Sequence, residues 1–128
     1  MTLGLACSAG PNTRLVTVRA GAGSGDVEFE VANATDVPIN SMYFAKTAKV
    51  SPELKFDSPQ GSAAWGGDVL THAIPVGTRV KVPVPEPGVW DVRAVDRDGR
   101  YQHITALKLQ PGGRFILELH DGSWRVDQ

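Results

Sequence analysis

The chain has 128 residues, with 13 Lys and Arg against 14 Asp and Glu and a formal net charge of −1. This length accommodates one domain with its own hydrophobic core. The near-neutral charge lacks the basic field that gives nucleic acids and anionic membranes their affinity, and no apolar run reaches the length of a membrane span. We therefore expect one domain that neither binds nucleic acid nor spans a membrane.

Cys7 is the single cysteine, and the three histidines are scattered along the chain. A single thiol excludes an intrachain disulfide and is too few for a zinc cluster. A dimer bridged through Cys7 is an open alternative. We expect no metal and no cofactor. Residues 1–12 are predicted to be a flexible leader and residues 13–128 the domain. The leader lacks the charged start and the full apolar stretch of a signal peptide, so the sequence does not decide the cellular compartment.

Three segments of the first half have strand patterns. Residues 14–19 are rich in β-branched residues and end at a glycine-rich linker. In residues 27–31, apolar and acidic side chains alternate, which predicts a strand with one face in the core and one in water. Residues 39–45 are apolar on parts of both faces, which favours a central strand of a sheet.

The region from Lys46 to Pro75 has no regular pattern. Pro52, Pro59 and several glycines exclude a long helix or strand there. Its apolar residues indicate that much of it packs onto the domain. We expect any helix of this protein to be a turn or two between Lys46 and Ile74. Loops of this length are usually mobile or functional.

The next segment, residues 78–84, alternates again, with Thr and Val separated by Arg79 and Lys81. Pro83 and Pro85 each remove a donor from the hydrogen-bond ladder. This strand is therefore predicted to lie at a sheet edge.

The clearest prediction is a β-hairpin. Residues 89–95 and 100–107 are rich in β-branched and aromatic side chains and flank the turn Asp96-Arg97-Asp98-Gly99. Asp-Gly favours such turns because Gly99 adopts a positive φ without steric cost. A further strand is expected at residues 114–120. The Asp121-Gly122 turn is expected to fold residues 123–126 back as a short closing strand.

Seven or eight short strands with almost no helical periodicity predict an all-β protein. The arrangement most typical of this pattern is a single-domain antiparallel β-sandwich of immunoglobulin-like type. A small barrel is the alternative.

No sequence motif for catalysis stands out. Asp96-Arg97-Asp98-Gly99 is similar to part of a calcium loop, but it offers two carboxylates where calcium takes six or more oxygens, which favours a plain hairpin turn. Nucleophile elbows, zinc-binding helices and phosphate loops are absent. His72, His103 and His120 are interpreted as strand or loop residues. We expect a protein that is not an enzyme.

Tryptophan and arginine side chains raise further hypotheses. Trp65 precedes two glycines and Asp68, so its indole either anchors a ligand or plugs one end of the sandwich while Asp68 accepts backbone N–H groups. The plug is favoured. Trp90 is expected in the core, and Arg93 is expected to stack or to pair on the opposite face.

The segment 46–62 mixes charged and apolar side chains in a way that packing alone explains poorly. Binding residues concentrate on loops held by rigid scaffolds, and an apolar patch with a charged rim is typical of protein-binding surfaces. The candidate binding residues are Val50, Leu54, Lys55, Phe56 and Trp65. The alternative is that Leu54 and Phe56 cover an open sheet edge.

Several short motifs occur in a recognisable order. They are Phe29-x-Val31-x-Asn33-x-Thr35, then Ile39 and Tyr43, then Trp65-Gly66-x-Asp68-x-Leu70, then a Pro75-x-Gly77 turn, and last Asp91-Val92-Arg93-Ala94-Val95-Asp96-x-Asp98-Gly99. Over about residues 27 to 119, the chain resembles a family of small, uncharacterised bacterial β-sandwich proteins. The resemblance implies an immunoglobulin-like fold and an exported protein, and it brings no activity with it.

The function predicted from the sequence is that of a non-catalytic binding or accessory module with another protein as its partner. One alternative is a structural subunit that pairs through an edge strand. The other is a small metal-dependent hydrolase with a site near His72 and Asp68. A pocket with clustered His and Asp side chains favours the enzyme, whereas an exposed apolar edge favours assembly.

Overall fold

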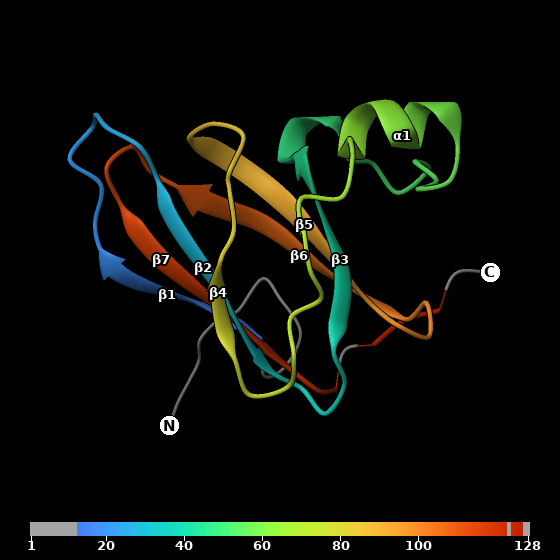
Figure 1. The fold of residues 1–128 in the computed structure, drawn as a ribbon. Coiled ribbons are helices and arrows are strands. Elements are labelled where there is room, and N and C mark those ends of the chain that lie inside the picture. The colour runs from blue at the N-terminus through green and yellow to red at the C-terminus, as the bar shows by residue number, and fades with distance from the viewer. Residues whose placement is uncertain (1–12, 123, 127–128) are drawn as a thin grey trace, which may run out of the picture.

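The structure is a computed structural model, and it describes residues 13–122 and 124–126. The predicted leader and Cys7 lie outside the described residues. The strands are β1 (Arg14–Arg19), β2 (Glu28–Ala34), β3 (Ile39–Lys46), β4 (Arg79–Lys81), β5 (Gly88–Asp96), β6 (Tyr101–Leu109) and β7 (Arg114–His120). The helical segments are the short 3₁₀ turn η1 (Thr47–Lys49) and the helix α1 (Pro59–Trp65) (Figure 1). The all-β prediction is confirmed, and the helices lie between residues 46 and 74 as predicted.

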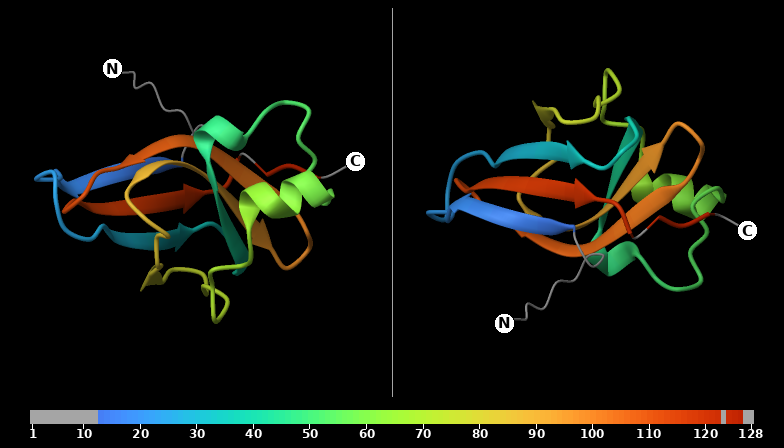
Figure 2. Two further views of the ribbon diagram at one scale, coloured as in Figure 1. Left: turned by 90° about the horizontal axis from the view of Figure 1, so that it is seen from above. Right: turned by 90° about the horizontal axis from the view of Figure 1, so that it is seen from below.

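The strands form two sheets that Figures 1 and 2 show as separate layers. One sheet has the order β1-β7-β2-β4 and the other has the order β3-β5-β6. The short strand β4 lies at a sheet edge, which confirms the prediction from the prolines beside it. The prediction of purely antiparallel sheets is wrong, because β2 and β7 run parallel, with Phe29 opposite Phe115. The chain visits the other sheet between these two strands, and this long crossover permits the parallel pair.

The core lies between the sheets. Phe44 of β3 connects them, with its ring centroid 5.7 Å from that of Phe29 in β2 and 6.1 Å from that of Trp90 in β5. Trp90 is buried, as predicted, and its indole N–H donates to the carbonyl of Glu86 over 2.9 Å. Burying a large apolar side chain contributes about 1.5–3 kcal/mol, so this shared core is the main source of stability.

β3 lies at the edge of its sheet, so the prediction of a central position is wrong. Its free edge is covered instead by the chain that follows α1: the Val69 N–H donates to the Met42 carbonyl, and Ile39 bridges Ile74. Both faces of β3 also carry buried side chains, since Phe44 faces the core and Ala45 lies on the opposite face with no exposed surface. Burial on both faces explains the apolar pattern that indicated a central strand.

The predicted hairpin is formed by β5 and β6, and Gly99 has a φ of 86°. Oδ1 of Asp96 accepts the N–H groups of Asp98 and Arg100 at 2.8 and 2.9 Å. This carboxylate stabilises the turn from within, as Asp does in many turns. Among the described residues there is no group of three or more His, Cys, Asp or Glu placed to hold a metal ion.

The chain after β7 does not form the predicted closing strand. Ser123 lies outside the described residues, and Arg125 makes a single bridge to Tyr101 of β6. The Asp121 carboxylate accepts the Asp36 N–H at 3.1 Å and the Trp124 indole N–H at 3.0 Å. The backbone of Arg125 then exchanges two hydrogen bonds with that of Tyr101, at 2.8 and 2.9 Å, which places this part of the chain beside β6. None of the helices in residues 13–122 and 124–126 has the length and hydropathy to cross a membrane.

Candidate functional site

The segment between β3 and the end of α1 forms a cover over the outer face of the β3-β5-β6 sheet. Ser58 caps α1 by accepting the Gly61 N–H at 2.9 Å, and Pro59 is the first helical residue. A Cβ atom at Gly61 would overlap the carbonyl oxygens of Lys55 and Phe56. The helix therefore packs directly on the backbone of residues 55 and 56, and this close approach fixes the cover.

Phe56 attaches the cover to the sheet. Its ring centroid lies 4.9 Å from that of Tyr43 and 6.2 Å from that of Trp65. Phe56 thus covers a sheet face, and the alternative that it covers an open edge is wrong. Trp65 is buried, but it lies against the same outer face, with its ring 5.4 Å from that of His103. The prediction that it plugs an end of the two-sheet stack is therefore wrong in its location.

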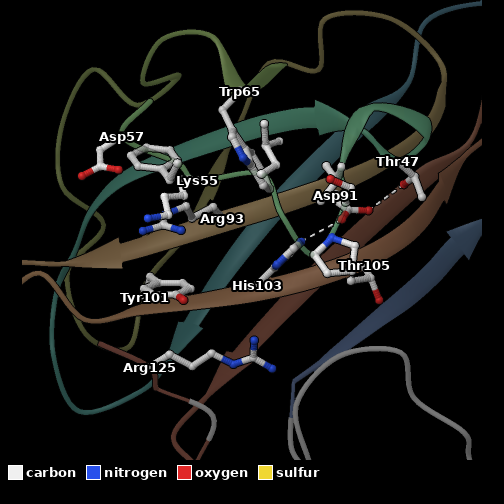
Figure 3. A pocket seen from close by; sticks show the side chains of 15 residues that line it. Thr47, Lys55, Asp57, Trp65, Asp91, Arg93, Tyr101, His103, Thr105 and Arg125 are labelled. Carbon is white, nitrogen blue, oxygen red and sulfur yellow. Dashed lines mark hydrogen bonds and ion pairs between the residues drawn. The ribbon is translucent and has the colours of Figure 1, made fainter. Parts of the chain in front are cut away.

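A pocket of about 620 Å³ lies between the cover and the sheet (Figure 3). The structure brings together in its lining all five candidates from the sequence, namely Val50, Leu54, Lys55, Phe56 and Trp65. The sheet side contributes Asp91, Arg93, Tyr101, His103 and Thr105, and Arg125 enters from the C-terminal segment. The volume is in the range of small-ligand sites, which is also enough for one or two peptide side chains.

Asp91 is the most constrained residue of the pocket. Only 2% of it is exposed, and its carboxylate accepts the Thr47 hydroxyl at 2.6 Å, the Ala106 N–H at 3.0 Å and His103 Nε2 at 2.7 Å. A buried carboxylate is tolerated only when its oxygens are paired in this way.

A β-bulge produces this arrangement. Trp90 pairs with Leu107 and Val92 pairs with Ile104, so Asp91 faces two residues of β6. The second of them, Ala106, has a φ of 56°, and its N–H donates to Asp91. A non-glycine residue at positive φ costs on the order of 1 kcal/mol, and such strain and such bulges concentrate at functional sites.

Arg93 forms the floor of the pocket, beside Asp91 and His103. Its guanidinium carbon lies 3.9 Å from the centroid of Phe56 and 3.7 Å from that of Tyr101, so the cation is stacked between two rings (Figure 3). Stacking is one of the two roles that the sequence predicted for this residue. Only 7% of Arg93 is exposed. Each such contact contributes about 0.5–2 kcal/mol, so the charge is held in one place.

His103 is one of the ionisable groups in the lining of the pocket. Nε2 of His103 makes the bond to Asp91, and it donates that bond when the carboxylate is ionised. Within the described part of the chain, no hydrogen bond is made by Nδ1. Neutral His103 therefore offers Nδ1 as an acceptor or base, in an orientation that Asp91 fixes.

The residues of the predicted hydrolase site do not line this pocket. Oδ1 of Asp68 accepts the N–H groups of Met42 and Leu70 at 2.9 and 3.0 Å, which confirms the backbone role predicted for it. His72 is exposed on the chain between α1 and β4. Asp68 thus attaches the chain after α1 to β3 through Oδ1, and the hydrolase alternative stays a prediction.

Asp91, Tyr101, His103 and Arg125 were not predicted from the sequence as site residues. A signal was present for the first three, because polar and aromatic residues share one face of the hairpin strands at alternate positions. That pattern is equally typical of a face in water. Only the tertiary position of the cover turns this face into a pocket.

Comparisons of this chain with family models, curated proteins and solved structures give no match. The resemblance to a family of small bacterial β-sandwich proteins stays a prediction. Some of the residues that carry it have structural roles: the Asn33 side chain donates to the carbonyls of Val37 and Ile74 and accepts the Thr35 hydroxyl.

Proposed function

We propose that this protein is an immunoglobulin-like β-sandwich that serves as a non-catalytic binding or accessory module, and that it recognises another protein through the pocket. The observation that carries the proposal is the concave outer face of the β3-β5-β6 sheet, where the cover encloses about 620 Å³. Aromatic and arginine side chains dominate the energetics of protein interfaces, and both types line this site.

The burial of Asp91 and Arg93 supports a recognition role. Two charged side chains are held beneath a loop at 2% and 7% exposure, although a stable sheet face needs neither. Replacing buried charges by apolar residues is often neutral or stabilising, so a buried network on an outer face favours a function other than stability. Fixed polar groups in an apolar pocket give a binding site its specificity.

Site-specific photo-crosslinking tests the proposal. A photoreactive phenylalanine analogue replaces Leu54, which lines the pocket, and the matched control carries it at Val18, which is 48% exposed on β1. We expect a crosslinked partner from position 54 and none from position 18. Crosslinks from position 18 alone, equal crosslinks from both, or none from position 54 would each overturn the proposal.

A second candidate function follows from the His103–Asp91 pair, whose 2.7 Å bond orients the imidazole as in enzymes that activate water. In this alternative, His103 takes a proton from a water molecule that attacks an ester. The test is hydrolysis of 4-nitrophenyl acetate by the wild type and by His103→Gln. A rate that the substitution does not change excludes this use of the pair.

A further inference from the structure

We propose that the partner inserts an acidic side chain, followed by an apolar one, into the pocket, and that Lys55 and Arg125 bind its carboxylate. This inference rests on the proposed function and names the chemistry of the segment that the pocket recognises.

The first support is the balance of charge around the pocket. Lys55, Arg93 and Arg125 line it, against Asp57 and Asp91. The Asp91 carboxylate is turned inwards and already accepts three hydrogen bonds. In a chain with a formal net charge of −1, a pocket lined by more cations than anions stands out. Complementary charge steers a partner and fixes its register, which favours an anionic group.

The second support is the state of the two cations at the mouth. Lys55 and Arg125 are both exposed, and neither has an ion pair with an acidic side chain in the described part of the chain. Other basic residues of the protein, such as Arg14 and Arg79, do pair with glutamates. In Figure 3, Arg125 lies beyond the ring of Tyr101, on the opposite side from Lys55 and Arg93. Both are long, exposed side chains at the rim of the pocket, so each is able to turn towards an anion that enters it.

The third support distinguishes a carboxylate from a more highly charged group. Asp57 is an exposed acid in the same lining, so a dianion such as a phosphate would meet more repulsion from it than a single negative charge. The rest of the lining includes Val50, Leu54 and the ring of Phe56. These side chains suit an apolar neighbour of the acidic residue, since apolar contacts supply affinity where the carboxylate supplies specificity.

The test uses blocked dipeptides and the full chain, followed by ¹H–¹⁵N NMR. N-acetyl-Asp-Phe-amide is the probe and N-acetyl-Asn-Phe-amide is its uncharged isostere. We expect the acidic peptide to shift the signals of Trp65 and His103 and to bind about fivefold to tenfold more tightly than the isostere. Lys55→Gln and Arg125→Gln should each remove most of this difference. Lys108→Gln, an exposed lysine of β6 outside the pocket lining, should leave it unchanged.

Several results would overturn the inference. Equal binding of the two peptides at the pocket means that the site exists without carboxylate recognition, so the proposed function would survive and this inference would not. Shifts confined to other surfaces, or no shifts at all in a folded protein, also refute it, and the crosslinking at position 54 then decides the proposed function independently. Tighter binding of N-acetyl-phenylalanine than of the aspartyl peptide would assign the site to a chain terminus and not to a side chain.

Discussion

The outer faces of the two sheets differ in how far their charged side chains are exposed to solvent. On the β1-β7-β2-β4 sheet, arginines and glutamates pair across neighbouring strands, and the arginines reach the solvent. Arg14 meets Glu118 at 2.8 Å with 67% of its side chain exposed. Arg79 meets Glu30 at 3.0 Å with 54% of its side chain exposed, although the side chain of Glu30 itself is only 12% exposed. On the β3-β5-β6 sheet, the cover buries Asp91 and Arg93 almost completely. Exposed pairs gain little because water screens them, whereas a buried charge depends on every partner that it has.

This difference separates stability from function in the molecule. The open face carries paired charges of both signs, which is typical of an ordinary protein surface. The covered face maintains a strained bulge and a buried carboxylate that the fold does not require, and it encloses the pocket. The contrast makes definite predictions, because equal substitutions on the two faces should have unequal effects.

The largest effect is expected from Asp91→Ala. The substitution leaves the Thr47 hydroxyl, the Ala106 N–H and His103 without their common acceptor. We expect the free energy of unfolding to fall by about 3 kcal/mol, against less than about 1 kcal/mol for Glu118→Ala on the open face. Urea denaturation monitored by tryptophan fluorescence measures both. Similar losses for the two variants would show that the network is not a buried one.

The second largest effect is expected from Gly61→Ala, which should lower the free energy of unfolding by about 2 kcal/mol. The added methyl group overlaps the carbonyl oxygens of Lys55 and Phe56, so either the helix or the cover has to move. Gly67→Ala is the matched control, because a Cβ at Gly67 has no neighbour within 4 Å. Denaturation of the two variants gives the comparison. A harmless Gly61→Ala would mean that the cover is not held by this contact.

The same contrast explains what the sequence was able to predict. Period-two patterns and the Asp96–Gly99 turn predicted the strands and the hairpin. They could do so because apolar and polar residues alternate along a strand that has one buried and one exposed face. The five binding candidates were found for a related reason: a loop with apolar side chains among charges has to pack on something. The position of β3 and the parallel pair of β2 and β7 depend on contacts between distant segments, which no local pattern records.

The pocket illustrates this limit most clearly. His103 and Asp91 are 12 positions apart and belong to strands whose polar faces look solvent-exposed. The bulge at Ala106 could not be predicted from a glycine or proline, because the residue with the positive φ is an alanine. The cover over this face is fixed by Gly61 and Phe56, whose partners are known only once the chain is folded.

Asp121 is a half-buried carboxylate. Its loss should destabilise the fold less than the loss of buried Asp91 and more than the loss of an exposed pair on the open face. The Trp124 indole N–H, and to a smaller extent the Asp36 N–H, hold the pKa of Asp121 below its ordinary value, against the opposing effect of burial. Its ionised form therefore stabilises the fold above its unfolded pKa of about 3.9, and this contribution is lost as the pH falls through the lower folded pKa. We expect Asp121→Asn to cost about 1 kcal/mol at about pH 7.

The pH dependence makes the Asp121 prediction specific. Wild type and Asp121→Asn should approach each other in stability as the pH falls below about 4, because the wild-type carboxyl then also becomes neutral. Urea denaturation at several pH values measures the difference between the two proteins directly. A difference that stays constant down to about pH 2 would show that the bonds to Trp124 and Asp36 do not depend on the charge.

The smallest effect is expected on the open face, from the double-mutant cycle of Arg14→Gln and Glu118→Gln. The Arg14 guanidinium, which donates to Glu118, lowers the pKa of that carboxyl, so the coupling is present above about pH 4.3 and is lost in acid. Because Arg14 is mostly exposed, we expect a coupling energy of about 0.5 kcal/mol that falls further in about 1 M NaCl. The cycle of Asp91→Asn and His103→Gln should give a coupling several times larger that salt hardly changes, since Asp91 is buried. If salt weakened both couplings equally, the pocket would be as open to water as the other face, and the distinction between the two faces would be lost.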